Sequence, residues 1–376
     1  MRISSAVFLL LGACSAPAAS GPEPTRALGA KSATRCAMLD GGAPVSGTWE
    51  DITPPQVNLA AFGFGVKAFV IDPNDSATVY LGTHAQGIYK SSDCGSTWSH
   101  VNTGVNGSKL DNGRNWTMVI DPTDSSIYTC AGYGPSGVWK STNGGVDWAQ
   151  ILTPNVTSVA PYGGFVEWIA MDPTDPTHLI VTFHGPCSPP APSECMAESK
   201  DSGATWNITG HPMFRSDKDA VYILSGATWI YGSWNAGWSG GIWRTTDGGG
   251  TWTQVTAEPA SATFYRSPVT GHLFVGGGFG IQESADDGVT WTVTPRTRTN
   301  AVTGSGTKLF ASNGGCLASP LPPFEPYFSA SEPSPKWSSL ASPLMTSGGL
   351  FLEYNQDQDL LYSSNCRGGF WRVWSP

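Results

Sequence analysis

The sequence predicts an all-β protein built from repeats, on three observations. One pattern, Ser/Thr-x-Asp/Asn-x-Gly-x-Thr/Asp-Trp, occurs five times with a period of about 40 to 50 residues, which is typical of four-stranded propeller blades. The 376 residues include 46 Gly, 29 Pro and 16 Trp but only 13% charged residues, which suits short strands joined by tight turns. Finally, incomplete units at the two ends of the chain complement each other. We therefore predict a seven-bladed β-propeller.

The repeated pattern is interpreted as a turn between the third and fourth strands of a blade. Its Asp or Asn side chain caps backbone N–H groups, its Gly permits a positive φ, and its Trp covers the hairpin. These carboxylates are therefore assigned to the scaffold and not to catalysis. The five copies occupy residues 91–98, 141–148, 199–206, 245–252 and 284–291.

The rest of each unit follows a common order. In the first three units an apolar strand ends in Asp-Pro-x-Asp, beginning at Asp72, Asp121 and Asp172, and a second strand, a loop and a third strand led by Gly come next. Units begin near residues 66, 115, 166, 220, 262, 301 and 350. Seven blades are expected, with six or eight left open because the sixth unit is weak.

The two ends of the chain are expected to close the ring. Residues 350–354, 360–363 and 368–373 form three strands of the last unit, which lacks a fourth. Residues 47–52 look like a lone fourth strand. Pairing these segments would remove both open edges of the ring.

The N-terminal residues read as an export signal followed by a tether. The apolar run before Cys14 is too short to span a bilayer, which needs roughly 20 residues, so residues 1–13 are predicted to be a signal peptide. Cys14 lies in a segment similar to a bacterial lipobox and would then carry a lipid, whereas ordinary cleavage within residues 16–19 is the alternative. Residues 14–46 would form a flexible tether and residues 47–376 the propeller. The protein is thus expected to be a cell-envelope lipoprotein or secreted.

An exported protein encounters oxidising conditions, so disulfides are expected. Cys187 and Cys195 flank a Pro-rich insertion and form the best candidate pair. Cys316 and Cys366 occupy matching positions of adjacent repeats, which makes a bridge between blades plausible. Apart from Cys14, the number of cysteines is odd, so at least one thiol should stay free.

Charge and motifs exclude several classes of partner. The net charge is −9 and no Lys/Arg stripe is present, which argues against nucleic acid or an anionic membrane surface as the main partner. Neither a zinc-type Cys/His cluster nor an EF-hand calcium loop occurs in the sequence, so we predict no metal and no cofactor. A monomer is expected, which contacts the membrane only through the lipid anchor.

The repeats resemble those of the Asp-box (BNR repeat) β-propeller superfamily, which includes sialidases, xyloglucan-hydrolysing glycosidases, sortilin-type receptors and photosystem II assembly factors. The segments Asp-Pro-x-Asp, Tyr-Leu-Gly-Thr and Gly-Ile-Tyr-Lys-Ser-x-Asp-x-Gly-x-Thr-Trp are most similar to the xyloglucanase and sortilin-like branch. The resemblance covers nearly all of residues 47–376. It implies the fold but not one function, because the superfamily holds hydrolases, lyases and binding proteins.

Three departures from the family patterns bear on function. The Phe/Tyr-Arg-Ile-Pro element of sialidases is absent, which argues against sialidase activity. Xyloglucanase-type enzymes place an Asp in the turn between the second and third strands of an early blade, where this chain has His84. Those enzymes also bind substrate between two propellers, and this chain has room for one.

A ligand site is expected on the face formed by the starts of the innermost strands and by the loops between second and third strands. Alignment of the first three blades places Lys67, Trp116 and Glu167 at equivalent innermost positions. The loop of residues 233–240 holds two Trp residues suited to stacking on sugars, although packing over the blade edge is an equal alternative. The candidate ligand-binding residues are Lys67, Arg114, Trp116, Tyr133, Trp168, His184, Trp234, Trp238 and Arg367.

The candidate catalytic residues are Glu167 and His84. Glu167 beside Trp168 could act as a general acid or base, and a buried Glu–Lys or Glu–Arg pair is the alternative. A glycosidase normally needs a second carboxylate at about 5–10 Å, for which Asp219 and Glu353 are candidates. His84 or His184 could serve a lyase-like mechanism, or could simply be surface residues.

Two functions follow from these observations. The first is an exported propeller that binds carbohydrate or serves as an envelope scaffold. The alternative is a glycoside hydrolase or polysaccharide lyase that acts on an extracellular polysaccharide. A polysaccharide or glycan is the expected partner in both cases.

Overall fold

A computed structural model describes residues 36–60, 64–153, 166–184, 195–210, 220–234, 240–316, 324–345 and 347–376. These residues belong to one unit, Ala33–Pro376. The predicted signal peptide, Cys14 and most of the predicted tether lie outside the described residues. Among the residues described, no helix is long and apolar enough to cross a membrane.

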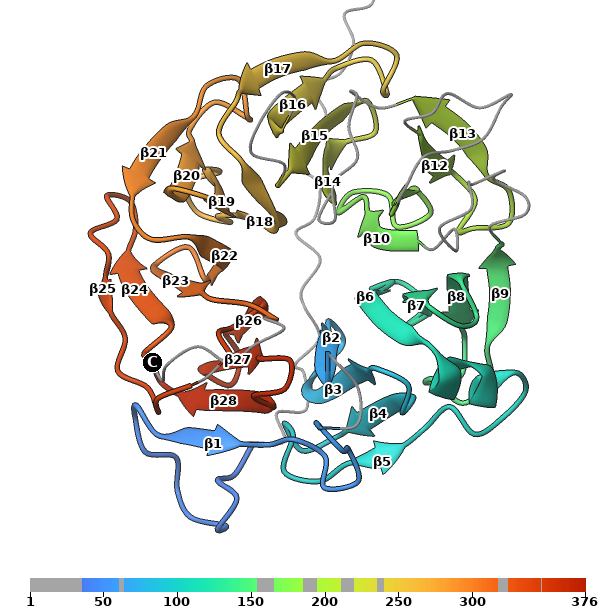
Figure 1. Ribbon diagram of the computed structural model, residues 1–376, viewed down its shortest axis with the longest axis vertical. Helices are drawn as coiled ribbons and strands as arrows, with labels where there is room; N and C mark the ends of the chain where they lie inside the picture. Colours follow the sequence, from blue (N-terminus) through green and yellow to red (C-terminus); the bar gives the residue numbers. More distant parts are fainter. Residues whose placement is uncertain are drawn as a thin grey trace, which may run out of the picture. The chain divides into compact units, whose positions relative to one another are not determined.

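The unit is a ring of seven four-stranded antiparallel sheets, as predicted (Figure 1). The sheets follow one another along the chain, and in the first six the strand that comes first lies nearest the centre of the ring. The first three blades comprise β2 (Val66–Asp72), β3 (Asp75–Thr83), β4 (Ile88–Ser91) and β5 (Ser99–His100); β6 (Arg114–Ile120), β7 (Ile127–Gly132), β8 (Gly137–Ser141) and β9 (Ala149–Leu152); and β10 (Val166–Met171), β11 (Leu179–Phe183), β12 (Cys195–Ser199) and β13 (Asn207–Gly210).

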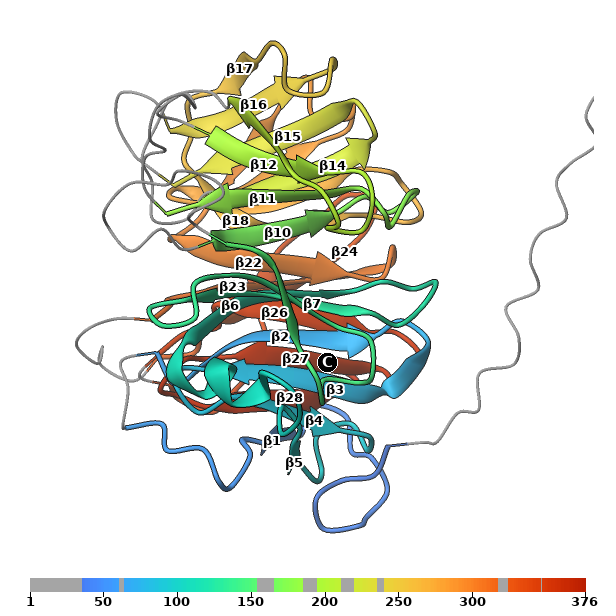
Figure 2. The same ribbon diagram turned by 90° about the vertical axis from the view of Figure 1, so that its right-hand side faces the viewer.

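The next three blades have the same strand order. In addition, a short 3-10 helix, η1 (Gly107–Asn112), connects the first blade to β6 of the second. They comprise β14 (Ala220–Ser225), β15 (Thr228–Ser233), β16 (Gly241–Thr245) and β17 (Thr253–Thr256); β18 (Ala260–Arg266), β19 (Leu273–Gly277), β20 (Gly280–Ser284) and β21 (Thr292–Pro295); and β22 (Thr299–Gly304), β23 (Lys308–Asn313), β24 (Tyr327–Ser331) and β25 (Ser338–Ser339). Figure 2 shows the strands crossing the ring from one face to the other, so all innermost strands begin on the same face.

The seventh blade joins the two ends of the chain, as predicted. It consists of β26 (Phe351–Asn355), β27 (Leu360–Ser364), β28 (Phe370–Trp374) and, as its outer strand, β1 (Trp49–Asp51). β1 pairs antiparallel with β28. The fully buried Arg372 strengthens this closure, because its guanidinium donates to Glu50 and to the carbonyls of Cys94 and Ala37, each at 2.8 Å.

The repeated turns are held by the hydrogen bonds that their sequence predicts. In the first copy, Ser91 Oγ accepts from the backbone N–H of Gly95 at 2.7 Å, while Asp93 accepts from the N–H and the hydroxyl of Thr97 at 2.8 and 2.6 Å. Gly95 has a φ of 95°, which favours glycine. Trp98 is buried and donates to the Ile52 carbonyl at 2.7 Å. The Asp side chain thus completes the turn, which joins the two outer strands of the blade, β4 and β5, away from the ring centre.

The apolar core lies between neighbouring blades. Each of the seven hydrophobic clusters combines side chains from two adjacent sheets, so every blade contact is an apolar interface. For example, Leu81 of β3 packs in one cluster with Tyr362 and Phe370 of the last blade. A blade therefore buries its two faces only when both neighbours are present, and closing the ring is required to cover the first and last blades.

Disulfides tie distant parts of the ring together. Cys316, after β23, and Cys366, before β28, form the bridge between blades that their repeat positions suggested. Cys36 and Cys94 form a second bridge, which the sequence analysis did not predict. Cys195 is also disulfide-bonded, whereas its predicted partner Cys187 lies outside the described residues. Among the described cysteines Cys130 is free, and it is buried.

Candidate functional site

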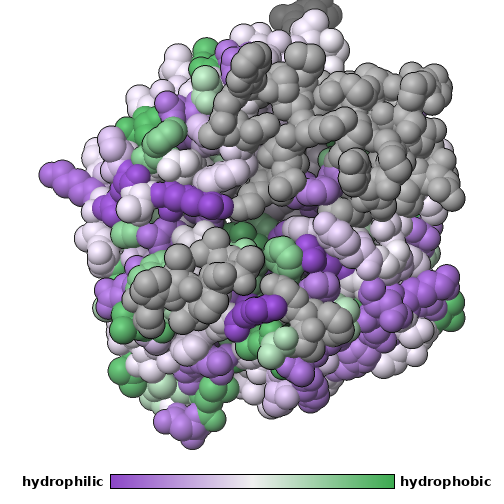
Figure 3. All heavy atoms as spheres, in the orientation of Figure 1, coloured by the Kyte–Doolittle hydropathy of each residue, from purple (hydrophilic) through white to green (hydrophobic). Residues whose placement is uncertain are grey.

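A pocket of about 370 Å³ opens at the centre of the face on which the innermost strands begin. Figure 3 shows this face, with hydrophobic residues visible at the bottom of a hollow near its centre. Most of the residues predicted to bind ligand, together with Glu167, line it. The lining residues are Phe64, Lys67, Arg114, Trp116, Thr117, Tyr133, Glu167, Trp168, His184, Ser261, Thr263, Asn300, Cys316, Leu350 and Phe351.

β-Bulges orient many of these side chains. The pairing between the first and second strands shifts register at Lys67 in the first blade, at Trp116 in the second and at Glu167 in the third. The same shift occurs between Ala260 and Phe264 in the fifth blade and at Asn300 in the sixth. A bulge turns side chains away from regular alternation and is common beside functional sites. The three positions that alignment of the repeats made equivalent, Lys67, Trp116 and Glu167, therefore coincide with β-bulges beside the pocket.

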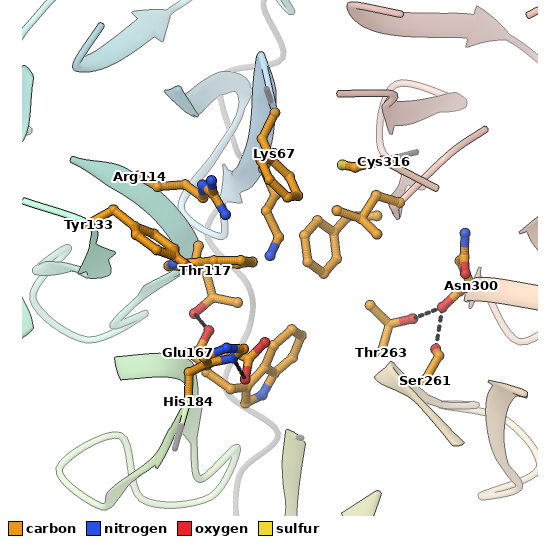
Figure 4. Close-up of a pocket in the computed structure, with 15 residues that line it drawn as sticks. Lys67, Arg114, Thr117, Tyr133, Glu167, His184, Ser261, Thr263, Asn300 and Cys316 are labelled. Atoms are coloured by element: carbon orange, nitrogen blue, oxygen red, sulfur yellow. Dashed lines mark hydrogen bonds and ion pairs between the residues drawn. The ribbon is translucent and has the colours of Figure 1, made fainter. Parts of the chain in front are cut away.

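One wall of the pocket combines two cations with aromatic rings (Figure 4). The Arg114 guanidinium lies 3.6 Å from the Phe64 ring centre and 4.4 Å from that of Tyr133. The Lys67 ammonium lies 3.1 Å from the Trp116 ring centre. Cation–π contacts of this kind stabilise a charge that has lost part of its water. Burial lowers the pKa of Arg114 to about 10, so the side chain remains a cation at neutral pH.

The next wall contains the predicted catalytic residue Glu167 and its partner. Glu167 is 5% exposed, and one of its carboxylate oxygens lies 3.3 Å from His184 Nδ1. The ring of the neighbouring Trp168 lies 5.9 Å from that of Phe351, and both residues line the pocket. Among the described residues, Glu167 therefore pairs with a histidine, whereas the sequence analysis had weighed a lysine or an arginine as its partner.

The opposite wall, as far as the structure describes it, is lined by polar side chains without charge. The hydroxyls of Ser261 and Thr263 both donate to the backbone carbonyl of Asn300, and the Asn300 amide donates to the Gly314 carbonyl. Sequence analysis missed these three lining residues, because the first strands of the fifth and sixth units lack the Asp-Pro-x-Asp signal that aligned the first three. The position of these residues at the start of an innermost strand could have indicated them, since Ala260 begins β18 and Thr299 begins β22.

Several predicted site residues lie elsewhere. His84 lies beside the pocket but is not among its lining residues: its ring is 6.1 Å from that of Phe64, and burial, aided by the Arg114 charge, lowers its pKa to about 4. Trp234 packs against Arg298, whose guanidinium lies 4.3 Å from the ring centre. Arg367 is exposed and does not line the pocket. Trp238 lies outside the described residues.

Among the described residues that line the pocket, Glu167 has no second carboxylate beside it of the kind that a glycosidase would need. Glu353 lines a smaller cavity of about 120 Å³, which shares Trp116, Trp168 and Phe351 with the pocket. Burial raises the pKa of Glu353 to about 8, so at neutral pH this carboxyl is mostly protonated. Asp219, the other candidate, lies outside the described residues. In the part of the chain that the structure describes, no group of three or more His, Cys, Asp or Glu side chains could hold a metal ion.

Sequence comparison connects part of the chain to glycoside hydrolases. A xyloglucanase of Hypocrea jecorina is 27% identical over 192 residues, which cover 44% of this chain and 23% of that enzyme. Xyloglucanase Xgh74A of Acetivibrio thermocellus is 26% identical over 200 residues, or 45% of this chain and 23% of the enzyme. The match thus spans less than a quarter of these relatives. No protein-family model matches the chain.

Structural comparison supports the fold along most of the chain. YCF48 from Cyanidioschyzon merolae superposes with a TM-score of 0.58 at 12% identity, covering 88% of this chain and 99% of YCF48. The RRP9 WD40 repeats give a TM-score of 0.61 at 10% identity, covering 88% and 98%. At these identities the similarity concerns the fold alone. The chain is a seven-bladed β-propeller whose sequence is similar, over less than half its length, to that of xyloglucanases.

Proposed function

We propose that this protein is an exported β-propeller that binds a glycan in the pocket at the centre of the ring. The observation that carries the proposal is the combination in one pocket of Trp116, Trp168 and Phe351 with hydrogen-bonding side chains. Aromatic faces stack on the apolar faces of sugar rings, and a few polar groups then select among sugars. The sequence similarity to xyloglucanases, whose name gives a polysaccharide as substrate, supports this class of ligand.

The placement of the carboxylates favours glycan binding over glycan hydrolysis as the function. Hydrolysis by the usual two-carboxylate mechanisms needs an acid and a base or nucleophile on both sides of one glycosidic bond. Glu167 is the carboxylate among the described lining residues, and it contacts His184. Glu353 lines the smaller cavity instead.

An enzyme is the second candidate, and the Glu167–His184 contact is the observation that favours it. A carboxylate that orients a histidine is a common arrangement for moving a proton. A glycoside hydrolase or polysaccharide lyase would use this pair as its acid or base. Turnover would then disappear in Glu167→Gln, while glycan binding would persist.

Export is supported by the disulfides Cys36–Cys94 and Cys316–Cys366, because such bonds persist in oxidising compartments. Export leaves two alternatives: a lipoprotein anchored through Cys14, or a protein released from the cell. Mass spectrometry of the mature N-terminus, prepared from the native host, distinguishes the two outcomes.

The binding proposal is tested with an array of plant and microbial polysaccharides, followed by calorimetry on the ligands found. Trp168→Ala should weaken binding at least tenfold, equivalent to about 1.4 kcal/mol. Trp234→Ala, which changes a tryptophan outside the pocket wall, is the matched control and should leave affinity unchanged. Loss of binding in the control alone would move the site to the loop of residues 233–240. Release of reducing sugars, or of the ultraviolet-absorbing unsaturated products of a lyase, would establish the enzyme instead.

A further inference from the structure

Arg114 lies in the pocket wall without an anionic partner among the described residues. Its side chain is 8% exposed, and Figure 4 shows the guanidinium directed toward the pocket. Its Nε is buried and makes no hydrogen bond within the described part of the chain. Glu167, the carboxylate that lines the same pocket, contacts His184 instead.

A buried guanidinium of this kind is costly for the folded protein. Removing a charge from water is unfavourable unless an opposite charge or hydrogen bonds replace the lost hydration. The rings of Phe64 and Tyr133, at 3.6 and 4.4 Å, replace part of it. Ring faces do not occupy the N–H groups in the guanidinium plane, so those groups remain suited to bind a planar anion.

The surrounding charges also favour an anion. Lys67 lies over Trp116 in the same wall, so two permanent cations and one carboxylate are found among the described lining residues. Among the described residues of the opposite wall, which include Ser261, Thr263 and Asn300, none carries a charge. The positive charge is therefore concentrated on one side of the pocket, beside the aromatic rings.

We propose that the ligand is an acidic glycan, which places a uronic-acid carboxylate or a sulfate ester against Arg114. This inference rests on the proposed function, because it names the class of glycan for the same pocket. The anion would accept from the guanidinium, the sugar ring would stack on Trp116 or Trp168, and the uncharged wall would meet the remaining hydroxyl groups. Arginine suits this role because its donors match the geometry of a carboxylate or sulfate.

The test measures affinity of the full mature protein for matched pairs of ligands by calorimetry. The first pair is an oligogalacturonide and its methyl ester, which differ in the carboxylate charge. The second is a sulfated carrageenan oligosaccharide and the same oligosaccharide after chemical removal of its sulfate groups. A neutral xyloglucan oligosaccharide completes the set. We expect one acidic ligand to bind at least tenfold more tightly than its neutral partner, and the pair that shows the difference identifies carboxylate or sulfate.

The same ligands are then tested with variants. Arg114→Met should weaken binding of the acidic ligand at least tenfold and make it less sensitive to salt. Arg298→Met is the matched control, because Arg298 also packs on a ring, that of Trp234, but does not line the pocket. The comparison of ligand pairs on the unchanged protein needs no variant, so it stays informative if Arg114→Met misfolds.

The outcomes separate this inference from the proposed function. Binding of neutral glycans with equal or higher affinity than acidic ones would overturn the inference and leave glycan binding intact. Equal affinity of Arg114→Met and the unchanged protein for an acidic ligand would do the same. Binding of no glycan of any kind would overturn both.

Discussion

Arg372 and Arg114 are both buried arginines, yet the protein gives them opposite surroundings. Arg372 is fully buried in the closing blade, where Glu50 and the carbonyls of Cys94 and Ala37 occupy its donors at 2.8 Å. Arg114 has aromatic rings beside it but, among the described residues, no hydrogen bond at Nε. The protein itself supplies hydrogen-bond partners to the buried arginine that stabilises the fold. The arginine in the pocket keeps donors that a bound ligand can use.

The acidic residues repeat this contrast. Hydrogen bonds from the turn, chiefly those of Thr251 and Thr290, lower the pKa of Asp247 and of Asp286 to about 2. Burial raises the pKa of Glu353, in the cavity next to the pocket, to about 8. The hydrogen bonds of these two turns therefore favour the charged form of their carboxylates, whereas burial disfavours the charged form of Glu353. A pKa shift caused by burial in a cavity is typical of ligand sites.

Changing Arg372 should have the largest effect on stability. Arg372→Met leaves Glu50 buried without its cation and is expected to lower the free energy of unfolding by about 3 to 5 kcal/mol. Urea denaturation measures the change, and Arg367→Met, an exposed position in the same blade, is the control. A loss below about 1 kcal/mol would mean that Arg372 does not hold the closing blade.

Glu353→Gln should have the next largest effect, and it should depend on pH. Because the folded state raises this pKa, Glu353 favours folding less and less as pH increases from about 4.5 to about 8. A glutamine at this position avoids that loss, so the variant should gain about 2 to 4 kcal/mol at about pH 9, at roughly 1.4 kcal/mol per pKa unit, and little at about pH 4. Denaturation at both pH values measures the gain, and a gain independent of pH would contradict this assignment.

Arg114→Met should behave oppositely to Arg372→Met. Replacing a buried cation that has no anionic partner in the described structure by an apolar side chain should leave stability unchanged or raise it by up to about 2 kcal/mol. The measurement is the same urea denaturation, without ligand. Destabilisation as large as that of Arg372→Met would show that Arg114 has a structural partner and would break the comparison between the two arginines.

The smallest expected effect is in the turn of the second blade. Here Asn143 donates to Asp147 at 2.8 Å, where the first turn has an Asp that accepts from Thr97. Asn143→Asp would place two carboxylates side by side and should cost about 1 kcal/mol at neutral pH, and less once both are protonated. Adding Asp147→Thr restores the pattern of the first turn and should recover the loss, apart from the hydrogen bond that Asp147 accepts from the Val105 N–H. Thermal melts check both variants, and no recovery would count against a purely local turn mechanism.

Local sequence was sufficient to predict the ring. The Asp, Gly and Trp of each turn interact within a few residues or with the next blade, so their spacing carries the blade repeat directly. The incomplete units at the two ends predicted the pairing of β1 with β28. Alignment of the repeats also brought Lys67, Trp116 and Glu167 together, because equivalent positions of the innermost strands meet around one axis.

Only the tertiary structure decided what the pocket contains. Ser261 and Asn300 reach it from blades whose first strands lack the repeated signal, and His84 lies beside Phe64 without lining the pocket. The sequence likewise does not predict that Arg114 contacts aromatic rings and, among the described residues, no carboxylate. The physical reason is that a blade repeat is encoded by local hydrogen bonds, whereas the pocket is the sum of side chains from several blades, distorted by bulges, that meet only after the ring closes.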